Sequence, residues 1–127
     1  MTEELETPVT ARNRIRAVGS QLVQAELSLK RARDAEVEAR QAYESAKRAA
    51  ALSPEAPRVA RGGATVAERE AWVDERCERL EFAYRVAEAN RQAATDHYKT
   101  VDTQAMLAQA ILKSIDRAFS AGTRDNQ

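Results

Sequence analysis

The sequence contains few of the residues from which most enzyme sites, metal sites and disulfide-bonded folds are built. Its 127 residues include one cysteine, one histidine, 4 glycines and 3 prolines. A lone cysteine forms no disulfide within the chain, and a zinc site needs several cysteine or histidine ligands. The composition therefore predicts neither an internal disulfide nor a metal centre.

Bulky apolar residues and long apolar runs are also scarce. Leu, Ile, Val and Phe together number 22, and no apolar run approaches the roughly 18 residues that a transmembrane helix needs. The first ten residues are acidic and lack the pattern of a secretory signal. We expect no membrane association and a place in the cytoplasm.

An excess of charge of one sign is missing as well, since 20 Lys and Arg balance 20 Asp and Glu. This balance argues against a protein that mainly coats nucleic acid, and against disorder, which combines low hydrophobicity with high net charge. Alanine is abundant, with 26 positions, and charged residues make up 31% of the chain. Such a composition is typical of long helices and coiled coils, so we predict an all-α fold without the bulky core of an enzyme.

One break divides the chain into two helices. Residues 53–65 hold two of the three prolines and two of the four glycines. Thr7 before Pro8 is a typical start for the first helix, Thr65 with Glu68 forms a capping-box pattern, and Gly122 is expected to end the second helix. We therefore predict a single domain with a helix at about 8–52, a linker at 53–64, a helix at about 65–121 and a polar tail at 122–127.

Both helices repeat apolar residues with the 3.5-residue period of a coiled coil. The rows of the first helix are Ile15, Leu22, Leu29, Glu36, Tyr43, Ala50 and Val18, Ala25, Ala32, Ala39, Ala46. The rows of the second are Val66, Val73, Leu80, Ala87, Ala94, Val101, Ala108, Ile115 and Glu70, Cys77, Tyr84, Arg91, Tyr98, Ala105, Leu112, Phe119. The 3.5-residue period predicts a left-handed coiled coil, and the many alanines predict that its helices are closely spaced.

The linker is long enough for the two helices to fold back into an antiparallel hairpin. Pairing them around its midpoint makes the numbers of facing residues sum to about 117. That register places Lys47 beside Glu70 and Glu26 beside Arg91, so two charged seam positions gain opposite charges. A parallel arrangement offers no such agreement, and we predict the antiparallel one.

The second helix extends past the start of the first with its most apolar stretch. This end has more bulky apolar residues than one seam needs, so either the N-terminal segment with Leu5 and Val9 covers it or another chain does. We favour another chain, in a dimer that closes into a four-helix bundle. The predicted oligomer or partner interface is Met106, Leu107, Ile111, Leu112, Ile115 and Phe119.

No residue pattern predicts catalysis or cofactor binding. His97 is the only histidine, and its polar surroundings indicate a surface position. Cys77 occupies a seam position, where a small apolar residue is wanted. Acidic residues alternate with arginines at helical spacing in residues 75–81, which is typical of surface ion pairs. No phosphate-binding loop, dinucleotide-binding, zinc-protease or nucleophile-elbow motif occurs, so we expect no enzyme.

Basic residues on the first helix raise a different hypothesis. A nucleic-acid contact would use a strip of positive charge along the phosphates, but aromatic stacking residues are missing from this segment. The alternative is a solvated face matched to an acidic partner. The candidate contacts are Arg12, Arg14, Arg16, Lys30, Arg31 and Arg33.

Residues 64–94 contain TVAEREAWVDER directly after Ala64, continue through AYRVAEA and follow a linker of the form PRVARGG. This segment resembles short coiled-coil helical proteins of actinobacterial phages, and the similarity extends more weakly through DHYKTVDTQAMLAQAILKSI. The resemblance implies a phage-encoded protein that acts in the bacterial host cytoplasm, near DNA recombination or replication functions. It brings no catalytic residues with it.

Three functions are consistent with these features. The first is a non-enzymatic helical protein that self-associates and binds a phage or host protein, such as a DNA-metabolism factor. The second is a single-stranded DNA-binding or recombination accessory protein that uses the basic strip. The third is a structural component of a virion.

Overall fold

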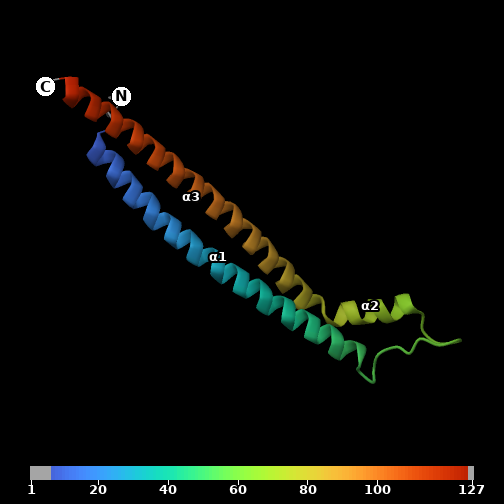
Figure 1. Ribbon diagram of the computed structural model, residues 1–127. Coiled ribbons are helices and arrows are strands. Elements are labelled where there is room, and N and C mark those ends of the chain that lie inside the picture. The colour runs from blue at the N-terminus through green and yellow to red at the C-terminus, as the bar shows by residue number, and fades with distance from the viewer. Residues whose placement is uncertain (1–6, 126–127) are drawn as a thin grey trace, which may run out of the picture. The chain divides into compact units, whose positions relative to one another are not determined.

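The computed structural model describes residues 7–125, and throughout this part of the chain the regular structure is helical. The elements are α1 (Pro8–Ala51), α2 (Val66–Arg76) and α3 (Glu78–Asp125), and the two long helices α1 and α3 pack together (Figure 1). The predicted all-α fold is confirmed. Among the described residues no helix is long and apolar enough to cross a membrane. Leu5, considered above as a cover for the apolar end, lies outside the described residues.

The chain divides into two compact units, each built from a piece of α1 and a piece of α3. Unit 1 pairs the beginning of α1, up to Leu29, with α3 from Ala94 onward, whereas unit 2 comprises Lys30–Ala93. Unit 2 therefore also contains the linker and α2. In each unit the residue numbers rise along one helix while those facing them fall along the other, so the pairing is antiparallel as predicted.

Burial follows the predicted heptad rows closely. All eleven row positions of α1 are buried or half-buried, and so are the row positions of α3 from Tyr84 to Ile115. In unit 1 the most buried of these are Ala25, Leu29, Val101 and Ala108. The predicted rows therefore mark the faces on which the two long helices pack together.

The second predicted helix is not continuous, because it breaks at Cys77. The backbone of Cys77 adopts φ −101° and ψ 5°, and its N–H donates to the carbonyl oxygens of Val73 and Asp74. In Figure 1 α2 turns away from the direction in which α3 begins. The break lets Val73 and Cys77 pack against Ala50 at the end of α1, and Trp72 packs against the same cluster. It leaves Leu80, a predicted seam residue, exposed.

The predicted helix starts are confirmed, whereas the predicted end of α3 is wrong. The Thr65 hydroxyl accepts from the N–H of Glu68 at 3.2 Å, and the Thr7 hydroxyl accepts from the N–H of Thr10 at 3.2 Å. Gly122 does not end α3, which continues to Asp125. The only glycine with a positive φ is Gly62 in the linker, so Gly122 does not adopt the left-handed conformation of a helix C-cap.

The register differs from the predicted one by about ten residues, since each α1 residue faces a later α3 residue than the linker midpoint implies. In unit 2 Arg91 Nε lies 2.6 Å from Glu36 Oε2, not beside Glu26, and the rings of Tyr43 and Tyr84 stack at 6.1 Å between centroids. The reason is that the linker does not make a minimal turn. Arg69 donates a hydrogen bond to the carbonyl oxygen of Ala51, and this bond holds the start of α2 at the end of α1. The rest of α1 therefore pairs with α3.

The ion pair between Glu36 and Arg91 replaces apolar contact on the seam. Hydrogen bonding by Glu36 raises the pKa of the Arg91 guanidinium, so the arginine is charged at every practical pH. Removing one partner leaves the other half-buried without a counter-charge, whereas replacing both with leucine restores an apolar seam. We expect Arg91→Leu to lower the thermal midpoint and Glu36→Leu with Arg91→Leu to raise it, measured by far-UV circular dichroism.

The exposed Asn90→Leu variant on the same helix is the matched control for this experiment. It adds a leucine to α3 without touching the ion pair, and its midpoint should stay near that of the wild type. A double leucine variant that melts below the wild type would show that the ion pair itself stabilises the hairpin.

Candidate protein-interaction site

The one cysteine and the one histidine of the chain, Cys77 and His97, lie apart from one another along the helices. Among residues 7–125 no cluster of three or more His, Cys, Asp or Glu could hold a metal ion. Cys77 is 2% exposed and packs as a small apolar residue with Ala50 and Val73, as its seam position predicts. His97 is exposed, as its polar surroundings predict.

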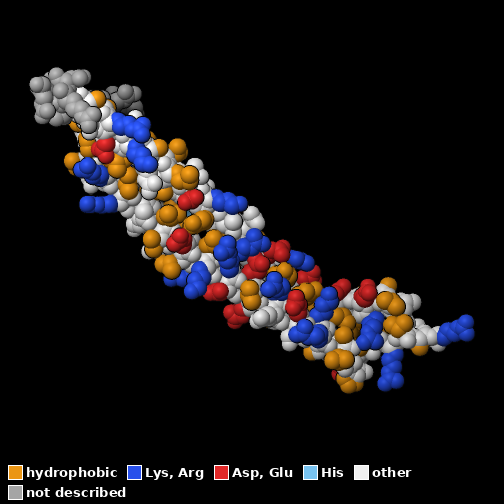
Figure 2. All heavy atoms as spheres, viewed as in Figure 1, with side chains coloured by type: hydrophobic (Ala, Val, Ile, Leu, Met, Phe, Trp, Pro, Cys, Tyr) orange, Lys and Arg blue, Asp and Glu red, His pale blue; other side chains and the backbone are white. Residues whose placement is uncertain are grey.

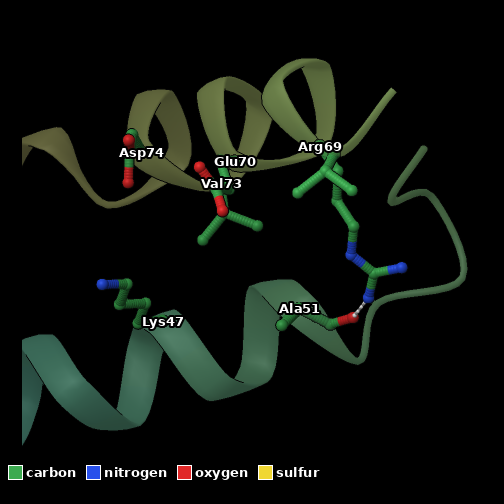
Figure 3. Close-up of a pocket in the computed structure, with 7 residues that line it drawn as sticks. Lys47, Ala51, Arg69, Glu70, Val73 and Asp74 are labelled. Atoms are coloured by element: carbon green, nitrogen blue, oxygen red, sulfur yellow. Dashed lines mark hydrogen bonds between the residues drawn. The ribbon is translucent and has the colours of Figure 1, made fainter. Parts of the chain in front are cut away.

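A pocket of about 520 Å³ lies between α1 and α2 in unit 2 (Figure 3). Lys47 reaches into it from α1, and Glu70 and Asp74 border it from α2. Lys47 and Glu70 thus line one pocket although the register that suggested their pairing is wrong elsewhere. Arg69 on its rim is already bonded to the Ala51 carbonyl oxygen. The pocket contains charges of both signs and no nucleophile next to a base, so it offers no evident chemistry.

The predicted interface residues of α3 divide into two groups. Leu112 and Ile115 are half-buried on the seam, so the hairpin itself uses them. The other four are exposed on α3: Met106 by 65%, Leu107 by 58%, Ile111 by 39% and Phe119 by 54%. Hydrophobic side chains are visible among the charged ones on the molecular surface (Figure 2). The surface available to a partner therefore excludes the seam residues.

An apolar groove lies next to these exposed residues, between α1 and α3 of unit 1. Its volume is about 250 Å³. The lining residues are Arg14, Val18, Gln104, Leu107, Ala108 and Ile111. Arg14 is the only charged side chain among them. A shallow apolar groove flanked by exposed Leu and Ile is a surface that a partner side chain can fill.

The outward side of α3 in unit 1 has a second heptad spacing that the sequence interpretation missed. We call it the outer stripe, and it repeats at intervals of four and three residues, as a coiled-coil seam does. All its members are exposed and uncharged. They are Thr100, Thr103, Leu107, Ala110 and Ser114. The signal was present in the sequence, but the more apolar inner rows dominate the same window.

The two threonines of the outer stripe need no external hydrogen-bond partner for their hydroxyls. Thr100 Oγ1 donates to the Asp96 carbonyl oxygen at 3.1 Å, and Thr103 Oγ1 donates to the Lys99 carbonyl oxygen at 3.0 Å. Burying a hydroxyl is costly only when its hydrogen bond is lost. The stripe can therefore be covered by another helix at little polar cost.

The candidate nucleic-acid residues of α1 are all exposed. Arg12, Arg14 and Arg16 belong to unit 1, and Lys30, Arg31 and Arg33 belong to unit 2. Alternate residues of a helix point about 200° apart, so Arg14 points away from Arg12 and Arg16, which are four residues apart and share one face. Arg12 lies 4.0 Å from Asp116, and Arg14 lines the apolar groove.

Comparisons with known proteins add no relative. No protein-family model matches the chain, and neither a curated protein nor a solved structure is significantly similar to it. The resemblance to phage proteins therefore stays a prediction.

Proposed function

We propose that this chain is a non-enzymatic helical-hairpin protein that self-associates through unit 1 and binds a protein partner. The observation that supports this function is the exposed apolar part of α3, with Met106, Leu107 and Ile111 beside an apolar groove. Exposed apolar surface of this kind is characteristic of interfaces between proteins. The simplest closure is a dimer that buries unit 1 of both copies in a four-helix arrangement.

The small size of the buried residues supports self-association on energetic grounds. Nine of the described hydrophobic residues are buried, and five of them are alanines. Burial stabilises a fold by about 25 cal/mol per Å² of apolar surface, and an alanine side chain contributes little surface. A second copy supplies apolar contacts that the hairpin by itself does not make.

The setting of this function comes from the resemblance of residues 64–94 to actinobacterial phage proteins. It supports a phage-encoded protein in the bacterial host cytoplasm, whose partner is a phage or host protein such as a DNA-metabolism factor. A structural role in the virion would use the same self-association.

We expect wild-type protein to run as a dimer of about twice 14.1 kDa in size-exclusion chromatography with light scattering. Leu107→Asp places a charge on the exposed apolar surface, and removing a central apolar contact of an interface typically raises Kd by about tenfold or more. Because Leu107 is exposed in the monomer, far-UV circular dichroism should show unchanged helicity at low temperature.

Val86→Asp is the matched control, since Val86 is 42% exposed on α3 but belongs to unit 2. Its dimer should persist. A monomeric wild type, or a dimer that tolerates Leu107→Asp, would contradict self-association through this surface.

Nucleic-acid binding through the basic residues is the competing function, and it makes a separate prediction. Phosphate contacts release counterions, so such binding weakens steeply as salt rises. Because Arg14 points away from Arg12 and Arg16, and Arg12 lies 4.0 Å from Asp116, we expect no complex with a single-stranded oligonucleotide at moderate salt. Fluorescence anisotropy at low and moderate salt is the measurement. Salt-sensitive binding that disappears when Arg12, Arg14 and Arg16 are changed to Glu would establish the competing function instead.

A further inference from the structure

We propose that the partner on the outer stripe of α3 is the same stripe of a second copy, antiparallel, with the twofold axis at Leu107. This inference rests on the proposed self-association and specifies its geometry. The antiparallel geometry follows from the order of the residues along the outer stripe. These residues all belong to unit 1.

Charge is the first argument for this arrangement. The heptad spacing of the outer stripe continues by one position at each end, to Asp96 before Thr100 and to Arg117 after Ser114. Between these two charges no stripe position is ionised. When two stripes run antiparallel about Leu107, Asp96 of one copy faces Arg117 of the other at both ends. When they run parallel in register, the two Asp96 side chains meet, and so do the two Arg117 side chains, which is repulsive.

Residue size is the second argument. In the antiparallel arrangement Thr103 faces Ala110, Thr100 faces Ser114, and the two Leu107 side chains meet at the axis. Small residues on both sides allow two helices to approach closely, as the alanines do on the inner seam. The threonine hydroxyls keep their bonds to their own helix, so covering the two threonines leaves neither hydroxyl without an acceptor.

The residues on either side of the stripe have the same symmetry. Met106 lies on one flank, where it meets its own counterpart, and Ile111 lies on the other, where it meets Gln104 beside the apolar groove. Lys99 and Lys113 share the flank of Met106. In the antiparallel arrangement Lys99 of one copy faces Lys113 of the other, which is a repulsive pair. Their long stems extend to solvent, so their ammonium groups can stay hydrated and apart at the edge of the contact. The exposed large apolar residues at the centre of α3 in unit 1, Met106, Leu107 and Ile111, are thereby covered by one contact, whereas Val23 and Leu27 on α1 lie outside it.

Reversing the end charges tests this register directly. Asp96→Arg places arginines against arginines at both ends of the contact, and Arg117→Asp places aspartates against aspartates. Each single change should raise the Kd of the dimer by about tenfold at low salt, because two exposed ion pairs become repulsive. The double variant Asp96→Arg with Arg117→Asp restores both pairs and should return the Kd to near the wild-type value. Sedimentation equilibrium gives the three constants.

The outcomes separate the register from the function. A dimer whose Kd is unaffected by the single changes, or that the double change fails to restore, overturns the antiparallel register but leaves self-association intact. A protein that is monomeric throughout contradicts both. Lys30→Glu, an exposed charge change in unit 2, is the control for a general effect of net charge.

Cysteine cross-linking tests the axis independently. Leu107→Cys brings two thiols together at the axis, whereas in Thr100→Cys the two introduced positions lie about 21 Å apart along the antiparallel helices, beyond the Cα separation of about 7 Å that a disulfide tolerates. Under mild oxidation the first variant should form a covalent dimer and the second should not. Wild type, whose only cysteine is the buried Cys77, is the control. Equal cross-linking of both variants would show parallel pairing and overturn the proposal.

Discussion

The close contact of small residues along the seam between α1 and α3 is the constraint on which the rest of the structure depends. In unit 1 Ala25 and Ala108 are almost fully buried, and in unit 2 the seam ends at Ala50. Alanines let two helices approach closely, but each buries little apolar surface, so stability has to come from length. Two helices of 44 and 48 residues supply that length. Because bulky apolar residues are scarce in this chain, an exposed Leu, Ile or Met is informative about where a partner could bind.

The heptad rows could be predicted from the sequence because they depend only on local periodicity. A helix converts a 3.5-residue repeat into one face whatever the partner is, so burial at positions such as Leu29 and Val101 follows from the spacing alone. The helix starts are equally local, since the Thr65 cap involves a bond over three residues. Regular length and apolar spacing therefore determined most of the fold.

The break at Cys77 and the register could not be predicted in the same way. No proline or glycine marks position 77, and the break is favoured by packing of Val73 and Cys77 on Ala50, residues distant in the sequence. The register then depends on how the linker and α2 fill the end of the hairpin, with Arg69 bonded to Ala51. A midpoint estimate assumes a minimal turn and cannot include these contacts. The candidate interface could be predicted only in part for a similar reason. The sequence alone did not distinguish Leu112, which lies on the seam, from Leu107, which lies outside it.

Charge distribution on α3 connects the fold to the proposed function. Ionised residues occupy nearly a third of the chain, whereas none of the exposed residues of α3 between Lys99 and Lys113 is ionised. An exposed helix face gains solubility from charge and loses nothing by it, whereas a face that is covered by another helix cannot hold unpaired charge. The outer stripe has no ionised residue along its length, as a covered face requires, and it has one charge of each sign at its ends. A surface with opposite charges at its two ends matches its own antiparallel copy, and this argues for self-association more directly than its hydrophobicity does.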